Sequence, residues 1–258
     1  MKYLPTKLID ELREKYNLVR NMKSTELIIK SKNRIKKSIE KSAQIHSYRI
    51  ENPDIKVPFC VSRNCNRKDI RTGIRNIENA FNWGIRNFNP YNFDESFIRE
   101  LAGKITPELY DNQIAQYRDK GISITGATVT PPYPYKLINF ELPKFVSSLK
   151  EQLKCKDLIN RIETATFAHL HLVRLHPFVD GNGRTSRTLQ NIILNYYSIP
   201  VPIIESGERH VYYQLLDKAI SDWDDKKGLG IKNGSSEGER LFYTLIASKI
   251  NVSLDKLI

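Results

Sequence analysis

Apolar residues recur at three- and four-residue steps along two neighbouring stretches of the chain. In the first stretch, 157–176, they are Leu158, Ile162, Ala165, His169, Leu172 and Leu175, counting the one histidine that keeps the spacing. In the second, 184–197, they are Leu189, Ile192, Ile193 and Tyr196. This period is typical of one buried face of an α-helix. Pro177 prevents the first helix from continuing in register, so we predict two helices joined by a loop.

A different pattern occupies residues 114–142. Ile122 and Ile124 alternate with polar residues, Gly121 and Gly126 flank them, and a Pro-Pro pair follows. This arrangement predicts a short β-hairpin and then an extended segment. Helical periodicity returns at 141–153 and again at 235–258. The fold class that we predict is therefore all-α, a helical bundle with one short hairpin.

Composition narrows the class of protein. The chain has 258 residues, 40% of them hydrophobic, and no apolar run approaches the roughly 18 residues that a membrane span requires. Its first residues contain no apolar block typical of a signal peptide, so we expect a soluble, cytoplasmic protein with no membrane partner. The three cysteines, Cys60, Cys65 and Cys155, form no CxxC pair. This number and spacing favour reduced thiols over a disulfide framework or a zinc site.

The net charge of +12 permits a polyanionic partner without requiring one. Much of the excess lies in 30–44, KSKNRIKKSIEKSAQ, where Ile35, Ile39 and Ala43 are four residues apart. That spacing favours an amphipathic helix with solvent-facing lysines over a nucleic-acid patch. Nucleic acid is therefore a disfavoured partner.

The loop between the two central helices, HPFVDGNGRTSR at 176–187, has the glycines that a phosphate cradle needs. Gly181, Asn182 and Gly183 can turn successive backbone N–H groups toward one point. The helix that follows, which we expect to begin near Arg184, adds the positive end of its dipole there. We therefore predict an anion site on this loop.

Four charged or titratable side chains complete the loop. Arg184 and Arg187 are three residues apart, so they share one side of the helix and can bind further phosphate oxygens. Asp180 would be repelled by a bare phosphate, and a magnesium ion held between them removes the conflict. His176 can accept a proton near neutral pH at the edge of the cradle, which suits a general base.

The loop matches the signature of the Fic domain family, HPFx(D/E)GNGRxxR, at every specified position, and the chain resembles that family over residues 45–225. The resemblance implies transfer of AMP from ATP to a hydroxyl side chain (Ser, Thr or Tyr) of a target protein. The roles it implies are His176 as base, Asp180 on Mg²⁺, the Gly181, Asn182 and Gly183 backbone on the α- and β-phosphates, and Arg184 and Arg187 on the β- and γ-phosphates.

Three details of the resemblance refine this expectation. The related Doc branch, which transfers a terminal phosphate, has a lysine where this chain has Gly183, so nucleotidyl transfer is favoured. Fic proteins carry a flap that binds the target backbone by strand addition; here it would be Ile122, Ser123, Ile124, Thr125 and Gly126, although Ala115 replaces the glycine that often precedes "QYR". Tyr212 and Tyr213 stand where the family surrounds the adenine.

A second motif resembles the family's inhibitory pattern, (S/T)xxxE(G/N). In SYRIEN, Ser47 and Glu51 are four residues apart and share a helix face, while Asn52 can take a left-handed conformation and Pro53 enforces the helix end. The resemblance, to the class whose inhibitory helix precedes the core, implies that Glu51 pairs with Arg187 in the place of the γ-phosphate. A similar stretch, SSEGER at 235–240, lacks the final Gly or Asn, and we reject it.

These observations predict an N-terminal helical region with the inhibitory helix (1–55), a Fic core (56–225) and a C-terminal helical tail (226–258). The alternatives left open are another nucleotide donor such as UTP, and a basic nucleic-acid-binding module without catalysis. Removal of AMP from targets, self-modification on a tyrosine and a homodimer are also left open. His169 and His171 are expected to pack in the protein and not to bind a metal, because no further ligands accompany them.

Overall fold

The computed structural model describes residues 3–21, 26–52, 67–229 and 235–258, with side chains from Ile70 onward in the third range. Every regular element in these ranges is helical. The helices are α1 (Thr6–Asn21), α2 (Glu26–Glu51), α3 (Arg67–Asn87), α4 (Glu95–Ile105), α5 (Pro134–Lys136), α6 (Leu142–Gln152), α7 (Leu158–Leu175), α8 (Asn182–Tyr196), α9 (Arg209–Gly228) and α10 (Glu237–Asp255). Short turns are η1 (Pro107–Leu109), the π-helical η2 (Leu137–Glu141) and η3 (Ser206–Glu208).

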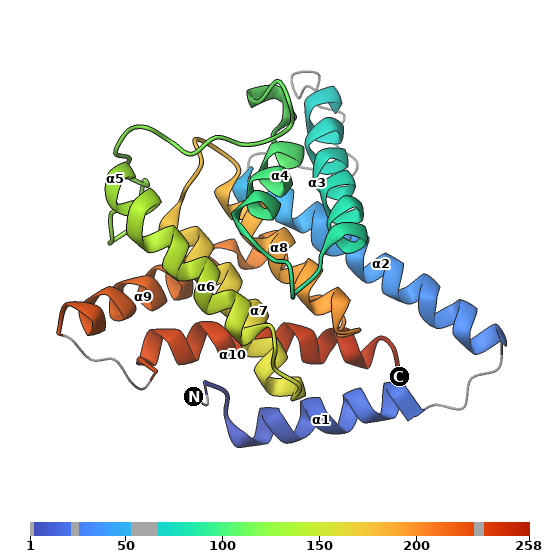
Figure 1. Cartoon of the computed structure of the whole chain (residues 1–258). Helices are drawn as coiled ribbons and strands as arrows, with labels where there is room; N and C mark the ends of the chain where they lie inside the picture. Colours follow the sequence, from blue (N-terminus) through green and yellow to red (C-terminus); the bar gives the residue numbers. More distant parts are fainter. Residues whose placement is uncertain (1–2, 22–25, 53–66, 230–234) are drawn as a thin grey trace.

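Helices α7 and α8 form the centre of the bundle, as Figure 1 shows. Asp157 begins α7 by accepting hydrogen bonds from the N–H groups of Ile159 and Asn160, which satisfies donors that the first turn leaves free. Both helices are buried on nearly all sides, which is typical of a core helix. The two predicted central helices and the loop between them are confirmed.

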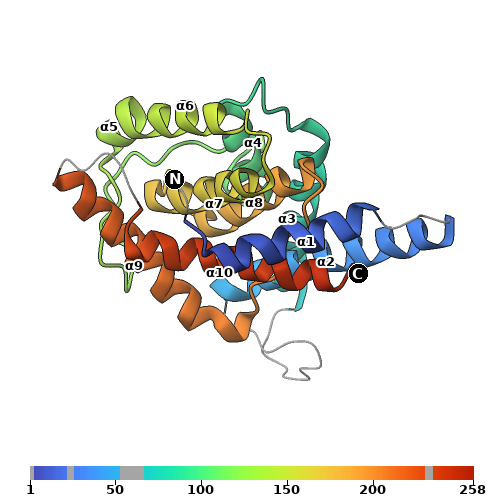
Figure 2. The same ribbon diagram turned by 90° about the horizontal axis from the view of Figure 1, so that it is seen from below.

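The other helices surround this pair. α6 and α9 contact α7, while α2, α3 and α4 contact α8. α10 packs on α9 and α1, and Figure 2 shows α1 lying along α10 on the lower face. One hydrophobic core runs from Leu4 in the N-terminal region through Leu170 to Leu254 in the C-terminal helix. The predicted three-part division thus crosses a continuous core, and its boundaries stay a prediction.

The predicted hairpin is wrong for the residues that the structure describes. Residues 121–124 form no regular secondary structure, and a turn at Thr125 and Gly126 follows, where Gly126 has a φ of 80° and the Ala127 N–H donates to the Ile124 carbonyl at 3.0 Å. Alternation of two isoleucines describes an extended backbone, but a strand needs a second segment in register beside it. The loop is instead fixed by Thr128, whose N–H donates to the Asp217 carboxylate at 2.8 Å.

The basic stretch at 30–44 lies within α2. Ile39 and Ala43 are buried on one side, and Lys30, Lys37 and Lys41 are exposed, so the amphipathic helix is confirmed. Within the described ranges, none of the helices combines the length and the apolar surface needed to cross a lipid bilayer. Cys155 is a free thiol, and Cys60 and Cys65 lie outside the described residues.

Candidate active site

The loop between α7 and α8 reverses the chain through two left-handed residues. His176 ends α7 with a φ of 47°, and Gly181 has a φ of 76°. α8 begins at Asn182, two residues before the expected start. The Asn182 side chain accepts from the Phe178 N–H at 2.9 Å and donates to the Phe178 carbonyl at 2.8 Å. This residue therefore fixes the shape of the loop, a role that the sequence analysis did not anticipate.

Gly183 leaves the first turn of α8 open to an anion. A Cβ atom there would lie 2.3 Å from Oε1 of Glu51 and 3.1 Å from a terminal nitrogen of Arg187. A side chain at this position would thus fill the space that the carboxylate of Glu51 occupies. The N-terminal end of a helix attracts anions through its free N–H groups and its dipole. In this structure a carboxylate from α2 lies where the sequence predicts a phosphate.

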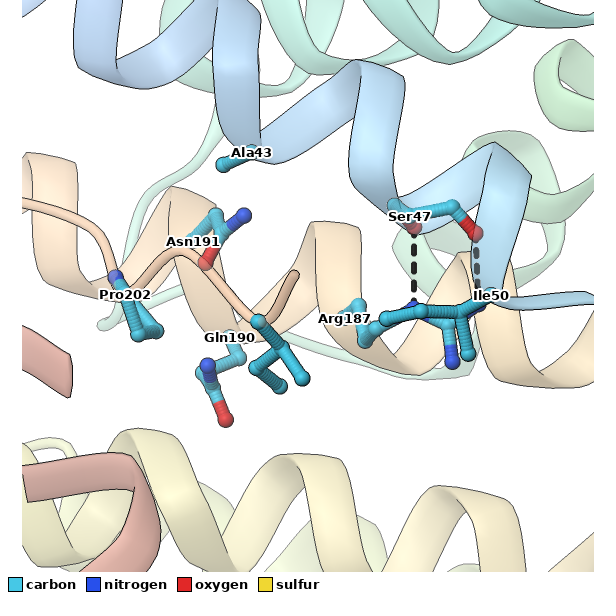
Figure 3. A pocket seen from close by; sticks show the side chains of 8 residues that line it. Ala43, Ser47, Ile50, Arg187, Gln190, Asn191 and Pro202 are labelled. Carbon is cyan, nitrogen blue, oxygen red and sulfur yellow. Dashed lines mark hydrogen bonds between the residues drawn. The ribbon is translucent and has the colours of Figure 1, made fainter. Parts of the chain in front are cut away.

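The Glu51 carboxylate bridges both loop arginines. Its Oε1 lies 2.6 Å from Arg187 and its Oε2 lies 2.8 Å from Arg184. Ser47 adds two contacts to Arg187, because its hydroxyl accepts from Nε at 2.9 Å and its carbonyl accepts from a terminal nitrogen at 3.0 Å. Figure 3 shows these two bonds between α2 and α8. The predicted pairing of Glu51 with Arg187 is confirmed, and Glu51 pairs with Arg184 as well.

Charge stays on both arginines in this setting. Burial lowers the pKa of Arg187, but Tyr212, Glu51 and Tyr213 together raise it above the ordinary value. For Arg184 burial also lowers the pKa, and Glu51 and Asp180 outweigh it. Arg187 is 4% exposed, so a charge there requires paired acceptors. The site is therefore a buried cationic pocket that needs an anion.

The end of the Ser47–Asn52 motif differs from the expectation. Positive φ angles at non-glycine residues occur at Gln113, His176 and Ser198 among the described residues, so Asn52 is not left-handed. Its N–H donates to the Arg49 carbonyl at 3.2 Å and its side-chain amide donates to the Tyr48 carbonyl at 2.9 Å. A side-chain amide that satisfies a terminal carbonyl ends the helix without a left-handed residue. Pro53 lies outside the described residues.

The rejected motif near the C-terminus has a structural role. Glu239 is 2% exposed, forms a capping box with Ser236 at the start of α10, and pairs with Lys226 at 2.7 Å. Its carboxylate is fully engaged at the junction of α9 and α10.

His176 is neutral at physiological pH. Burial lowers its pKa to about 4, and the Val173 carbonyl raises it only in part; the Nδ1 atom is buried without a well-formed hydrogen bond. Glu51 and Asp180 also act on the pKa of this imidazole, which puts it in the same charged environment as the anion site. A neutral imidazole can accept a proton from an incoming hydroxyl.

Arg118 holds the start of the 176–187 loop through a hydrogen bond to His176, and the sequence analysis did not predict this role. It is 2% exposed, and its Nε donates to the His176 carbonyl at 2.8 Å. Its two terminal nitrogens donate to the Lys120 and Pro132 carbonyls. One guanidinium thus ties His176 to both ends of the loop at 120–132. The "QYR" tripeptide was the only sequence signal, because the three acceptors are backbone atoms that no side-chain pattern reveals.

Asp180 lies at the exposed edge of the site. Its side chain is 60% exposed, and one oxygen lies 2.8 Å from Arg184. The described residues contain no cluster of three or more His, Cys, Asp or Glu side chains that could enclose a metal ion. A single accessible carboxylate beside a phosphate site nevertheless suits Mg²⁺, which is commonly held by one or two carboxylates together with substrate phosphates. The residues present fit such a shared ion.

The tyrosines and upstream histidines divide between core and site. Tyr212 is 1% exposed and its hydroxyl contacts Arg187 at 3.2 Å, while Tyr213 is partly buried against Arg209. His169 and His171 are buried within the bundle, as expected. Of the predicted site, the structure thus brings together Ser47, Glu51, His176, Asp180, Gly183, Arg184, Arg187 and Tyr212.

Comparison with known proteins agrees with this geometry. The bundle with a helix–loop–helix anion site at its centre is the fold of Fic-domain proteins. It superposes on a Fic domain containing signaling protein from Bacteroides thetaiotaomicron with a TM-score of 0.69 at 22% identity, over 96% of this chain and 94% of that chain. For Fic-1 from C. elegans the TM-score is 0.70 at 18% identity, over 97% and 72%.

Sequence comparison gives a family match for part of the chain. Residues 92–194, less than half of the chain, match the Fic/DOC family model. The chain is 33% identical over 124 residues to a protein adenylyltransferase Fic from Nematostella vectensis and 44% identical over 122 residues to one from Drosophila yakuba. Each alignment covers 47% of this chain and 27% or 24% of the relative, so the matched part is about a quarter of those proteins.

Proposed function

We propose that the protein transfers AMP from ATP to a Ser, Thr or Tyr hydroxyl of a target protein, and that Glu51 holds it in an inhibited state. The observation that carries the proposal is the anion site. Arg184, Arg187 and the open first turn of α8 converge on one carboxylate. A triphosphate offers the same site more negative charge and more acceptor oxygens than a carboxylate does.

In the proposed reaction the backbone of Gly181, Asn182 and Gly183 binds the α- and β-phosphates, and the two arginines bind the β- and γ-phosphates. The target hydroxyl oxygen attacks the α-phosphorus, its proton passes to His176, and the bond to pyrophosphate breaks. Because the pKa of His176 is about 4, the imidazole is free to take that proton at neutral pH. Asp180 would hold Mg²⁺, which neutralises phosphate charge when bound.

Inhibition follows from competition for Arg187. This guanidinium cannot orient the terminal phosphate while Glu51 and Ser47 use its donors. ATP then binds in an unproductive pose, with its α-phosphorus out of line with the attacking hydroxyl. The curated relatives of this domain are named protein adenylyltransferase Fic, which supports the nucleotidyl-transfer chemistry.

The proposal includes two further assignments, a target-binding segment and an adenine pocket. The backbone at 121–124 would pair with a strand of the target, and Tyr213, with Tyr212 behind it, would line the adenine pocket. A cytoplasmic location, a homodimer, self-modification and AMP removal by Glu51-activated water remain predictions of the sequence. The second candidate function is transfer from another donor such as UTP, since the cradle recognises phosphates and not the base.

The test uses magnesium, α-labelled ATP and three proteins: wild type, Glu51→Gly, and Glu51→Gly with His176→Ala. Label bound covalently to protein, with and without added candidate targets, is counted. We expect label with Glu51→Gly only. Label that persists without His176 would contradict its role as base. An α-labelled UTP arm tests the second candidate, and release of label by the wild type tests AMP removal.

A further inference from the structure

A chain of buried hydrogen bonds leads to Arg187 from the side opposite α2. Gln190 on α8, His169 on α7 and Tyr212 on α9 are each 0–1% exposed. The His169 ring nitrogens lie 2.7 Å from the Gln190 Oε1 and 2.8 Å from the Tyr212 hydroxyl. That hydroxyl lies 3.2 Å from a terminal nitrogen of Arg187. Figure 3 shows the Gln190 side chain on α8 pointing away from Ser47 on α2. The hydrogen-bond chain through Gln190 and the contacts with Ser47 therefore lie on different sides of α8.

The chemistry of the groups fixes the direction of every bond. Burial and the Arg187 charge lower the pKa of His169 to about 3, so its ring is neutral and carries one N–H. Because the Gln190 oxygen can only accept, Nδ1 donates and Nε2 accepts. Tyr212 must then donate its proton to His169, which leaves its lone pairs for the Arg187 N–H. In the reverse direction the Tyr212 oxygen would accept from both His169 and Arg187, and its own proton would lose the acceptor that His169 provides.

The consequence concerns what holds Arg187 when the inhibitory contact opens. Ser47 and Glu51, which also hydrogen-bond to Arg187, both belong to α2. Away from the inhibitory helix, Arg187 contacts two tyrosines of α9, Tyr212 through the bond above and Tyr213 through a second side-chain hydrogen bond. Tyr213 is partly buried, whereas Tyr212 is 1% exposed, so we single out Tyr212. Its ring packs against His169 and Phe242 in the core, and burial raises the pKa of its hydroxyl to about 12, so it remains a protonated, fixed acceptor.

We propose that Tyr212, oriented by His169 and Gln190, is a positioning residue that keeps the Arg187 guanidinium directed at the nucleotide's terminal phosphates after α2 has released it. The proposal rests on the proposed function for its ligand, ATP. It assigns His169 a role beyond core packing, because a neutral imidazole acceptor is what leaves the Tyr212 lone pairs available.

The main test measures ATP–Mg²⁺ binding to Glu51→Gly by equilibrium titration, with transfer kinetics followed separately. Tyr212→Phe deletes only the hydroxyl, and a hydrogen bond to a charged group is worth about tenfold or more in binding. We expect Kd and KM for ATP to rise about tenfold with kcat changed much less. Tyr243→Phe is the matched control, since Tyr243 is equally buried on α10 and its ring stacks on Tyr3 instead of contacting Arg187.

A double-mutant cycle separates positioning from packing. If Tyr212 acts through Arg187, Tyr212→Phe should cost less than about twofold in ATP binding once Arg187→Ala is present. A merely structural role would give the same loss with and without Arg187, and that result would overturn the proposal. A loss equal to that of Tyr243→Phe would overturn it as well.

Two variants of His169 test the relay. His169→Gln can place an amide oxygen near the former Nε2 and should retain most of the affinity, whereas His169→Leu should match Tyr212→Phe. Equal affinity losses in the two would overturn the relay from His169. If the ATP-binding results are as expected but no covalent label appears, the proposed transfer is refuted and the positioning role of Tyr212 stands. Absent ATP binding by Glu51→Gly would overturn both.

Discussion

Removal of the Glu51 carboxylate should raise the catalytic efficiency of transfer. Glu51 is the last residue of α2, so glycine costs little helix stability there. The side chains of Glu51, Arg184 and Arg187 are 21%, 10% and 5% exposed, which limits screening by solvent. Each hydrogen bond to a charged group contributes about 1.5–3 kcal/mol. Because phosphate oxygens replace part of what is lost, we take about 3 kcal/mol for releasing both arginines.

That free energy corresponds to a productive state populated at about one part in a hundred. Glu51→Gly should therefore raise kcat/KM for ATP about hundredfold. The Kd for ATP should change by less than tenfold, because in the proposed inhibited state ATP binds in another pose. The assay is the initial rate of covalent labelling against ATP concentration, with ATP affinity measured separately by titration.

Glu40→Gly provides the control for damage to the helix. Glu40 is on α2 and accepts from Asn195 at 2.7 Å, away from both loop arginines, so this variant should stay as inactive as the wild type. Glu51→Gln, which keeps the size but removes the charge, should give an intermediate rate. A rise of less than about threefold in folded Glu51→Gly would refute the reasoning, as would an equal rise in Glu40→Gly.

Four further outcomes follow from the same structure. Burial lowers the pKa of His176 to about 4, so kcat/KM of Glu51→Gly should fall only below about pH 5; an acid limb centred near pH 6.5 would contradict the assignment. The pKa of His169 is about 3 in the folded state and near 6.5 unfolded, so the unfolded chain takes up the proton first. Urea titrations should therefore give a lower unfolding free energy at pH 5 than at pH 7, and a smaller fall in His169→Gln. Arg118→Lys should lose about 2–4 kcal/mol of unfolding free energy and most of the labelling activity, because one ammonium group cannot hydrogen-bond to three carbonyls in the same way. An unchanged urea midpoint would disprove the role of Arg118 in holding the His176 loop. Chelation by EDTA should stop labelling until Mg²⁺ returns, and Asp180→Asn should raise the Mg²⁺ concentration needed; an unchanged requirement would remove Asp180 from the metal site.

The local sequence determined the central helices and the chemistry of their loop. The spacing of Leu158, Ile162 and Leu172 requires a helix whatever surrounds it, and Pro177 must interrupt that helix. The loop residues lie within twelve consecutive positions, so their convergence needs no knowledge of distant segments. The partner of Arg187 was also predictable, but only through resemblance to a family motif.

Contacts between distant segments were beyond the sequence. The predicted flap at 122–126 has no partner strand among the described residues, because strand pairing depends on what lies beside it. Arg118 binds backbone carbonyls, which carry no residue signature. The path from His169 to Arg187 joins three helices through the packing of α7, α8 and α9. Residue order alone determined which groups are present at the anion site, whereas helix packing decided which of them hold one another in place, because hydrogen bonds form only where the fold brings donor and acceptor within about 3 Å.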